Sequence, residues 1–338
     1  MQKIFLGSAA LLLSAGVASA QVTLTGDGRM GVVFDDRAAA FSFVEDEDGE
    51  FTLERDGFES RTQFSQRYRV QFNASGTTDT GLTFGGFARV QFGGNTTNAT
   101  GGSVAAGQQL FISSAFGRIE MGDVSGAVES AVGDLHGVGY AGIGFENENQ
   151  FIVRRFNDGV ARDLGDTGPG VRYSYSFGDA SIFANVSQIE PDTQGRSYGL
   201  GAAYSFEGFR IGGGIERLNT PSGSAFGNFN HAAVALGYSF DIFEVRATYG
   251  RVDSAAVDDG LLSRRDQFGI SGAVNFDDIG VTAFYRRDFE DLLHVGVGAS
   301  YDLGGGAVVR TGLVRSTRYA GEVRPNRTRA DFGINLSF

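Results

Sequence analysis

The sequence of 338 residues has no cysteine, no tryptophan, four prolines and a single lysine, Lys3. The absence of cysteine excludes a disulfide framework and a thiolate metal site. The formal net charge of −12 argues against nucleic-acid binding, which needs a basic footprint. No segment beyond the first 20 residues approaches 18 consecutive apolar residues, which excludes a helical membrane protein.

The first 20 residues have the pattern of an export signal. Residues 1–3 carry a positive charge, residues 4–17 are mostly apolar, and residues 18–20 are small. This order is typical of a secretory signal peptide with its cleavage site. We therefore expect residues 1–20 to be removed and residues 21–338 to form the mature domain.

What the chain has in abundance is glycine and aromatic residues, with 52 Gly, 30 Phe and 11 Tyr, which fits a large antiparallel sheet. Polar and apolar residues alternate with a period of two, the pattern of strands with two unlike faces. In 292–303, for example, Val295 and Val297 face one way, and His294 and Gly296 face the other. Most such segments have the ~9–11 residues that a tilted strand needs to cross a bilayer. The sixteen segments are 22–34, 60–75, 81–93, 108–114, 117–122, 168–177, 180–189, 197–206, 208–218, 231–241, 243–253, 265–276, 279–288, 292–303, 306–317 and 328–338.

The connections between these segments alternate between short and long. Residues 115–116 and 277–278 are tight turns, whereas 35–59, 123–167 and 219–230 are long and polar. Bacterial outer-membrane barrels have short periplasmic turns and longer extracellular loops. We therefore predict an all-β fold, a 16-stranded antiparallel transmembrane β-barrel, in the outer membrane of a Gram-negative bacterium. Both termini are expected on the periplasmic side.

The end of the chain supports this prediction. Residues 331–338 alternate without a break from Asp331 to the C-terminal Phe338. Chain ends usually fray, so a strictly two-faced strand at this position indicates the strand that closes a barrel. We expect Phe338 to act in assembly rather than in the pore.

A barrel of about 16–18 strands leaves an aqueous channel, so the inward residues matter most. On the second segment Phe64 and Phe72 face outward, which turns the arginines between them inward. The same alternation applies to the first, third and sixteenth segments, which are neighbours in a closed barrel. The predicted pore-lining basic residues are Arg29, Arg61, Arg67, Arg69, Arg89 and Arg329.

The longest connection, 123–167, is too long for a structureless loop without a role. Its first half is rich in small apolar residues, so we expect it to fold into the barrel as a constriction loop. There it would present carboxylates to the arginines, and the field between the two would select polar solutes. The predicted pore-lining acidic residues are Asp123, Glu129, Asp134, Glu146 and Glu148.

Three stretches resemble the general porins of photosynthetic alphaproteobacteria: 113–123 (SSAFGRIEMGD), 133–140 and 298–306 (GASYDLGGG). The resemblance covers the whole mature chain. It implies a homotrimer of sixteen-stranded barrels whose third extracellular loop folds inward to form an eyelet. It also implies passive diffusion of ions and small hydrophilic solutes. The chain departs from this family in an acidic first loop and in Arg154, Arg155 and Arg162, which lie in the second half of the third loop.

No group of residues indicates an enzyme or a firmly bound cofactor. The acidic run 45–49 is similar to an EF-hand loop, but Val44 and Arg55 would stand at the first and last ligand positions, so the motif fails. The same acids could still bind Ca²⁺ loosely, as related porins do. The three histidines lack the spacing of a zinc site, and no nucleophile-elbow pattern is present.

We therefore expect a general diffusion porin that lies among outer-membrane lipid and lipopolysaccharide as a homotrimer, without a nucleic-acid partner. Two alternatives stay open at this point. One is a solute-specific channel, and the other is a barrel with a plugged lumen that serves as an anchor or a membrane hydrolase.

Overall fold

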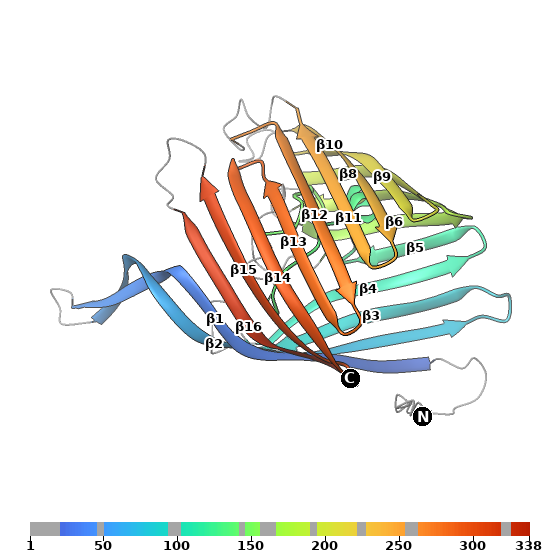
Figure 1. Ribbon diagram of the computed structural model, residues 1–338. Coiled ribbons are helices and arrows are strands. Elements are labelled where there is room, and N and C mark those ends of the chain that lie inside the picture. Colours follow the sequence, from blue (N-terminus) through green and yellow to red (C-terminus); the bar gives the residue numbers. More distant parts are fainter. Residues whose placement is uncertain are drawn as a thin grey trace.

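The computed structural model describes residues 21–45, 51–93, 103–141, 146–155, 167–189, 195–221, 228–253, 263–318 and 326–338. These residues contain sixteen strands in one closed antiparallel barrel, in which β1 pairs with both β2 and β16 (Figure 1). The predicted fold class is confirmed, whereas the predicted signal peptide, 1–20, lies outside the described residues. The strands are β1 (Gln21–Glu45), β2 (Phe51–Thr77), β3 (Thr83–Phe92), β4 (Ser103–Ser114), β5 (Gly117–Gly122), β6 (Thr167–Phe177), β7 (Ala180–Ile189), β8 (Gly195–Phe206), β9 (Phe209–Asn219), β10 (Phe229–Phe240), β11 (Phe243–Val252), β12 (Asp266–Phe276), β13 (Ile279–Arg287), β14 (Leu292–Gly304), β15 (Ala307–Arg318) and β16 (Arg327–Ser337).

Tight turns gather at one end of the barrel. Residues 207–208 join β8 to β9, and residues 277–278 join β12 to β13. Glu207, Gly208 and Asp277 have φ angles of 45°, 84° and 47°. Positive φ in a two-residue turn matches the twist of the strands that the turn joins. We call this end of the barrel the tight-turn end. The opposite end, from which the connection after β5 leaves, is called the long-connection end.

The connection predicted over 35–59 is the clearest difference from the sequence analysis. β1 continues to Glu45 and β2 begins at Phe51, and these extensions pair with each other and project beyond the barrel (Figure 1). The reason is local, because 41–44 (FSFV) and 51–53 (FTL) alternate around an acidic turn, which is a hairpin signal. Residues 46–50, which hold most of the acids considered for Ca²⁺, lie outside the described residues.

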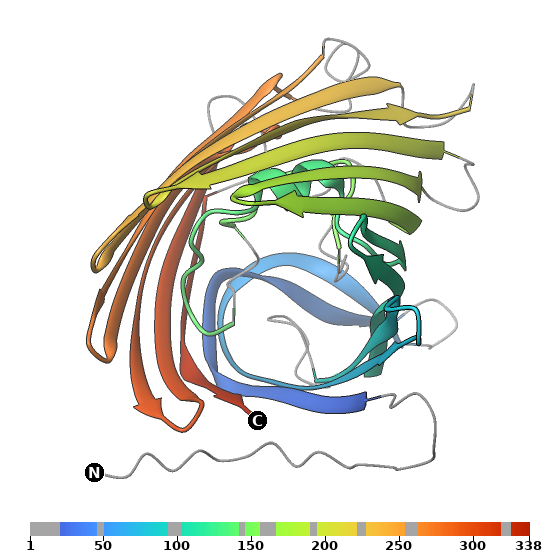
Figure 2. The ribbon, with the colours of Figure 1, turned by 90° about the vertical axis from the view of Figure 1, so that its right-hand side faces the viewer.

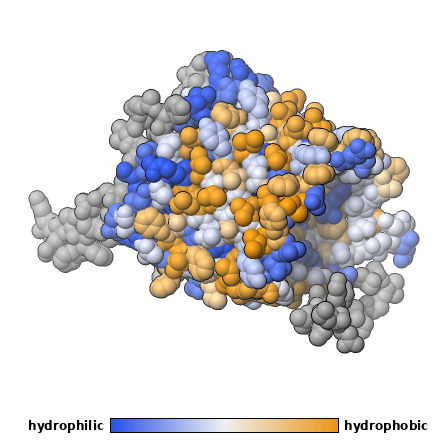
Figure 3. Space-filling model, viewed as in Figure 1, coloured by the Kyte–Doolittle hydropathy of each residue, from blue (hydrophilic) through white to orange (hydrophobic). Residues whose placement is uncertain are grey.

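The outer face of the barrel is apolar. On β8, Tyr198, Leu200, Tyr204 and Phe206 are 44%, 59%, 47% and 53% exposed, while their inward neighbours are mostly buried. Figure 3 shows hydrophobic residues across the middle of the wall and hydrophilic ones toward the upper rim. A belt of this kind is the surface that lipid covers in a transmembrane barrel. Among the described residues, no helix is long and apolar enough to span a membrane.

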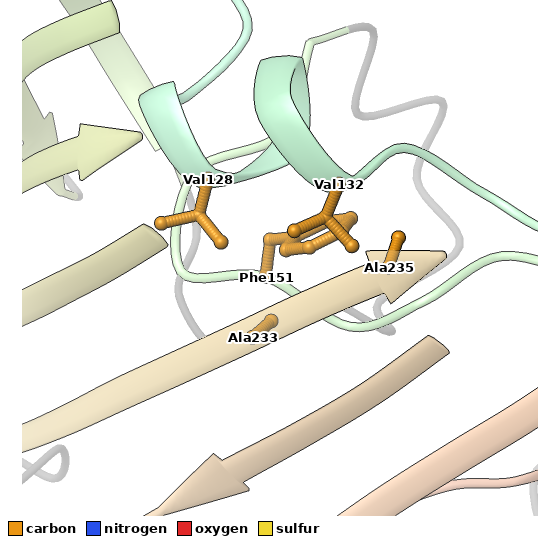
Figure 4. Packing of buried hydrophobic residues seen from close by; sticks show 5 residues of the cluster. All are labelled: Val128, Val132, Phe151, Ala233 and Ala235. Atoms are coloured by element: carbon orange, nitrogen blue, oxygen red, sulfur yellow. The ribbon is translucent and has the colours of Figure 1, made fainter. Parts of the chain in front are cut away.

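The connection after β5 turns into the barrel. Its described parts, 123–141 and 146–155, are called the inner segment here, and they contain the short helix α1 (Ala127–Val132). Figure 2 shows α1 within the ring of strands, and its contacts are with β7, β8, β9 and β10. Val128, Val132 and Phe151 pack on Ala233 and Ala235, which face inward from β10 (Figure 4). A hydrophobic core thus joins the inner segment to the wall.

Candidate functional site: the barrel interior

Glycines on the inner wall allow α1 to approach closely. A Cβ at Gly201 of β8 would overlap the carbonyl oxygen of Ala127, and one at Gly212 of β9 would overlap that of Ala131. The backbone of α1 therefore lies directly on the backbone of the wall. Asn185 of β7 accepts a hydrogen bond from the Ala127 N–H at 2.8 Å, which fixes the start of the helix.

Two arginines of the wall hold the other end of α1. Arg210 of β9 donates to the Ala131 carbonyl oxygen at 3.4 Å, and Arg246 of β11 donates to that of Val132. The last carbonyls of a helix have no partners within it, and cationic side chains satisfy them well. The helix is thus bound to the wall at both ends.

Beyond α1 the inner segment follows the wall across successive strands. The N–H of His136 donates to Ser271 Oγ of β12 at 3.0 Å, and Thr282 of β13 donates to the Gly137 carbonyl at 3.1 Å. These bonds are made by backbone groups of the segment. They therefore fix its path without depending on its side chains.

The segment then reaches the strands that carry the predicted arginines. The Ala141 N–H donates to Asp331 Oδ2 of β16 at 2.9 Å, and the Tyr140 hydroxyl lies 3.4 Å from the Ser65 carbonyl oxygen of β2. Tyr140 and Ala141 are buried there against Val33 of β1. The inner segment therefore extends from β7 to the seam where the barrel closes.

The returning part of the segment is held in the same way. Gln267 of β12 accepts from the Gln150 N–H at 2.9 Å and donates to its carbonyl at 2.7 Å. Glu216 of β9 accepts from the Ile152 N–H at 2.6 Å and lies 2.7 Å from His231 Nδ1. Both Glu216 and His231 are fully buried. Both limbs of the inner segment are thus fastened to the wall.

Glu146 is a predicted acidic residue that the structure pairs with a predicted arginine. It contacts Arg329 of β16, and its other oxygen lies 2.8 Å from His294 Nδ1. Asp288 lies 2.9 Å from the second nitrogen of His294. Burial acts to raise the pKa of Asp288, but the hydrogen bond from His294 holds it below its ordinary value. This charged group is buried, and it anchors the segment to the wall.

Three other predicted acidic residues meet an arginine of their own segment. Arg154 donates to both oxygens of Asp134 at 3.1 and 2.6 Å and lies 3.2 Å from Glu148. Burial raises the pKa of Glu129 and of Glu148 to about 7 in each case, and the nearby Asp134 acts in the same direction. Burial acts to lower the pKa of Arg154, yet Asp134 and Glu148 hold it above its ordinary value. We call Glu129, Asp134 and Glu148 the carboxylate cluster.

The predicted arginines of β1 to β3 share the inward face of neighbouring strands. Arg29 is paired in register with Arg67, whose guanidinium lies 2.6 Å from Asp27. Arg69 donates to Gln91 Oε1 at 2.5 Å. Arg29, Arg67, Arg69 and Arg89 are called the arginine wall here. They lie on one side of the barrel, whereas α1 lies against β7 to β10.

The remaining predicted residues stand at the edges of this site. Arg61 is half-exposed beside Glu59, toward the long-connection end of β2. Asp123 directly follows β5, and its N–H donates to the Gln108 carbonyl at 2.9 Å. Arg61 therefore lies apart from the arginine wall. Burial lowers the pKa of Arg155, and Asp123 lies close enough to this arginine to act in the opposite direction, as Glu129 also does.

Comparison with known proteins agrees with this geometry. The sequence profile of Gram-negative porins matches residues 7–319. A porin of Rhodobacter capsulatus is 30% identical over 94% of this chain and the whole of that protein. The chain belongs to the Gram-negative porin family. A porin structure refined at 1.8 Å resolution matches with a TM-score of 0.66 at 27% identity. A mutant Rh. blastica porin has the same fold, with a TM-score of 0.64 at 20% identity. Each match covers 94% of this chain and the whole of the compared chain.

Membership of this family confirms the predicted function. The porin is a general diffusion channel of the outer membrane and not an enzyme. This also removes the alternative of a barrel that serves as a membrane hydrolase. The water-filled interior of a large barrel is the path along which its solutes pass.

Several interior charges of the porin escaped the sequence analysis. They are Glu120, Arg172, Arg210, Glu216, Arg246 and Arg286. Arg172 lies against Glu120 and donates to Ser130 Oγ of α1 at 2.6 Å. The sequence does contain a signal for them. The alternation that places Arg67 on the inward face of β2 also places these residues on the inward faces of β5, β6, β9, β11 and β13.

Proposed function

We propose that the inner segment and the arginine wall together form the eyelet of this porin. The supporting observation is the fastening of both limbs of the segment to the wall, through Asn185, Gln267 and Glu216 among others. A segment held by buried hydrogen bonds narrows the channel permanently. Solutes then pass between the segment and the strands that carry the arginine wall.

The charges on the two sides of this passage set its selectivity. The arginine wall contributes guanidinium groups, and the carboxylate cluster contributes acids that Arg154 balances only in part. Opposed charges in a narrow wet passage orient dipolar solutes and distinguish cations from anions. We infer that small hydrophilic solutes pass without a saturable binding step.

Planar-bilayer recording tests this proposal. Purified protein should give stepwise openings, and liposomes that contain it should swell in sugars at rates that fall with sugar size. Saturable uptake of one sugar would favour a solute-specific channel. Silent insertion of folded protein would contradict an open passage and favour a plugged barrel.

We also propose that the porin is a homotrimer with both termini in the periplasm. Gln21 pairs with Ser75 close to the turn after β2, so the mature chain starts at the tight-turn end, which is periplasmic in bacterial barrels. Phe64 and Phe116, 81% and 85% exposed, give apolar surface for contact between copies. Light scattering of the detergent-solubilised protein measures the number of copies.

We propose that the porin works without a cofactor. Among the described residues, no group of three or more His, Asp or Glu side chains is arranged to hold a metal ion. Conductance should therefore not change when EDTA is added, and loose binding of Ca²⁺ at the acids of 45–48 stays a separate proposal.

A further inference from the structure

Two phenylalanines face the channel from neighbouring strands. On β3 Phe87 shares the inward face with Arg89, and on β4 Phe111 is paired in register with the inward Glu120 of β5. They are diagonal neighbours across the β3–β4 pair, where Phe111 is opposite Gly85. Both rings are half-buried. Two aromatic rings thus lie on the inner face of the barrel, next to the arginine wall.

A guanidinium lies on the ring of Phe111. Arg118 Cζ of β5 is 3.6 Å from the centroid of this ring. Arg118 Nε also donates to Glu120 Oε1 at 2.9 Å, so the ring on one face and the carboxylate at one edge fix the plane of the guanidinium. The side chain of Arg118 is still 35% exposed, and because β5 turns it inward, the exposed surface faces the channel.

A second guanidinium lies over the ring of Phe87. It belongs to Arg155 of the inner segment, whose Cζ is 4.7 Å from the ring centroid. The carboxylates of Asp123 and Glu129 are near enough to offset part of the charge of Arg155. Because this stack joins the inner segment to β3, it lies at the rim of the proposed eyelet, whereas Arg118 lies nearer the tight-turn end.

The group around Arg118 carries a positive charge. One carboxylate, Glu120, lies between two guanidiniums, and the Nε atoms of Arg118 and Arg172 are each 2.9 Å from one of its oxygens. Glu120 is 3% exposed, so the arginines form the side of this group that solutes meet. An anion is therefore attracted to the wall beside the ring of Phe111.

A guanidinium is planar and weakly hydrated, so its face stacks on π systems while its charge attracts anions. A guanidinium with one face on a phenyl ring keeps the other face for such a contact. We infer that these two stacks form a binding path for planar organic anions, of which aromatic carboxylates are the simplest. The π system of the solute lies on the guanidinium of Arg118 or Arg155, and its carboxylate is attracted by the positive charge beside them.

This inference rests on the proposed eyelet, because solutes meet both stacks only if they pass between the inner segment and β1 to β3. The contact is a weak one, and it raises the concentration of such solutes in the passage only a few times. Planar anions therefore pass faster than non-planar anions of similar size, and they do so without saturating the channel.

Reversal potentials in planar bilayers test the path with benzoate and cyclohexanecarboxylate, two probes of equal charge and similar size. The purified porin is recorded at pH 8, where both probes are anions, with the potassium salt of one probe on one side and KCl on the other. We expect benzoate to be about two- to fivefold more permeant than cyclohexanecarboxylate. Equal permeability of the two probes in the wild type would overturn the inference.

The double variant Phe87→Leu, Phe111→Leu removes both rings and changes no charge, so the ratio of the two permeabilities should fall toward one. Both probes are anions, so a change in overall ion preference would not alter this ratio. Arg118→Lys keeps the charge without the plane and should lower the ratio in part. The matched control is Phe84→Leu, Phe92→Leu, whose rings are 40% and 47% exposed on the outward face of β3, and it should keep the wild-type ratio.

A wild-type ratio in the inward double variant would overturn the role of the two rings. Arg118→Lys gives an independent answer should that variant not fold. Currents in KCl alone separate this inference from the proposed function. Open channels that do not prefer benzoate contradict only the stacking path, whereas folded but silent barrels contradict the proposed passage and the path with it.

Discussion

The ring of Phe338 is stacked on that of Tyr68, with centroids 5.5 Å apart and planes inclined by 22°. Gly26 and Phe338 exchange two backbone hydrogen bonds of 2.7 and 3.0 Å. Phe338, which directly follows β16, is thus bound to β1 through its backbone and to β2 through its ring. A Cβ at Gly26 would overlap this ring, so the glycine is what lets the ring lie flat on the seam.

Phe338→Ala should therefore reduce the yield of folded barrel without changing the conductance of the channels that form. Loss of an aromatic pair costs about 1 kcal/mol. The folded fraction can be read from heat-modifiable mobility in gel electrophoresis. Phe332→Ala, on the same outward face of β16, is the control and should assemble better. Equal yields of the two variants would contradict the role of the terminal ring.

Arg67→Glu and Arg69→Glu should each shift ion preference toward cations. Each variant replaces a positive charge of the arginine wall by a negative one. The Arg67 variant also places a second carboxylate beside Asp27. Reversal potentials under a KCl gradient measure the shift. Arg315→Glu makes the same charge change on the outer surface and should leave the potential close to that of the wild type. Unchanged potentials in all three would show that these arginines do not line the passage.

Gly212→Ala should disturb the inner segment. The added Cβ overlaps the Ala131 carbonyl oxygen, so α1 must move, at a cost of roughly 1–3 kcal/mol. We expect altered single-channel conductance and more current noise. Gly237→Ala is matched to it, since Gly237 lies on neighbouring β10 and its added Cβ meets nothing closer than 3.8 Å. Equal conductance of the two variants would contradict the close packing of α1 on Gly212.

The carboxylate cluster predicts a pH dependence around neutrality. Glu129 and Glu148 each have a pKa of about 7, so both lose their negative charge as the pH falls from 8 to 6. Ion preference should then shift toward anions. The double variant Glu129→Gln, Glu148→Gln should remove this shift between pH 8 and 6. A wild-type reversal potential that stays constant over this range would contradict the assignment.

The same pKa values have a consequence for stability. The folded protein binds these protons near pH 7, whereas an ordinary glutamate binds its proton near pH 4.5. Between these two pH values the folded state carries more protons than the unfolded state. The contribution of these two groups to the free energy of unfolding therefore increases as the pH falls through 7 and decreases as the pH rises. Thermal unfolding at pH 6 and 8, with the double variant as control, measures this difference.

The strands could be predicted from the sequence because lipid outside and water inside impose a strict alternation on every one of them. β8 and β14 have nearly the predicted bounds, 197–206 and 292–303. The largest difference, the paired ends of β1 and β2, lies beyond the barrel, where the composition is polar although the alternation persists.

The carboxylates were harder to predict. Alternation gives no direction for side chains on an irregular segment. Charge alone suggested that Asp134 and Glu148 face the arginines of the barrel. The structure pairs both with Arg154, which follows them on the same segment. Glu146 does contact a predicted arginine, Arg329, but this arginine lies outside the arginine wall and the pair is buried. Such pairings depend on how the segment folds back on itself, which no local pattern records.

The hydrogen bond from Ala141 to Asp331 joins two residues that are 190 positions apart. Asp331 belongs to β16, the last strand to enter any chain that is made from its N-terminus. The hydrogen bond that holds Ala141 cannot form before that strand is in place. Tyr140 and Ala141 must wait for β1 and β16 to meet before they are buried. The proposed eyelet is therefore completed late in folding, after the barrel has closed.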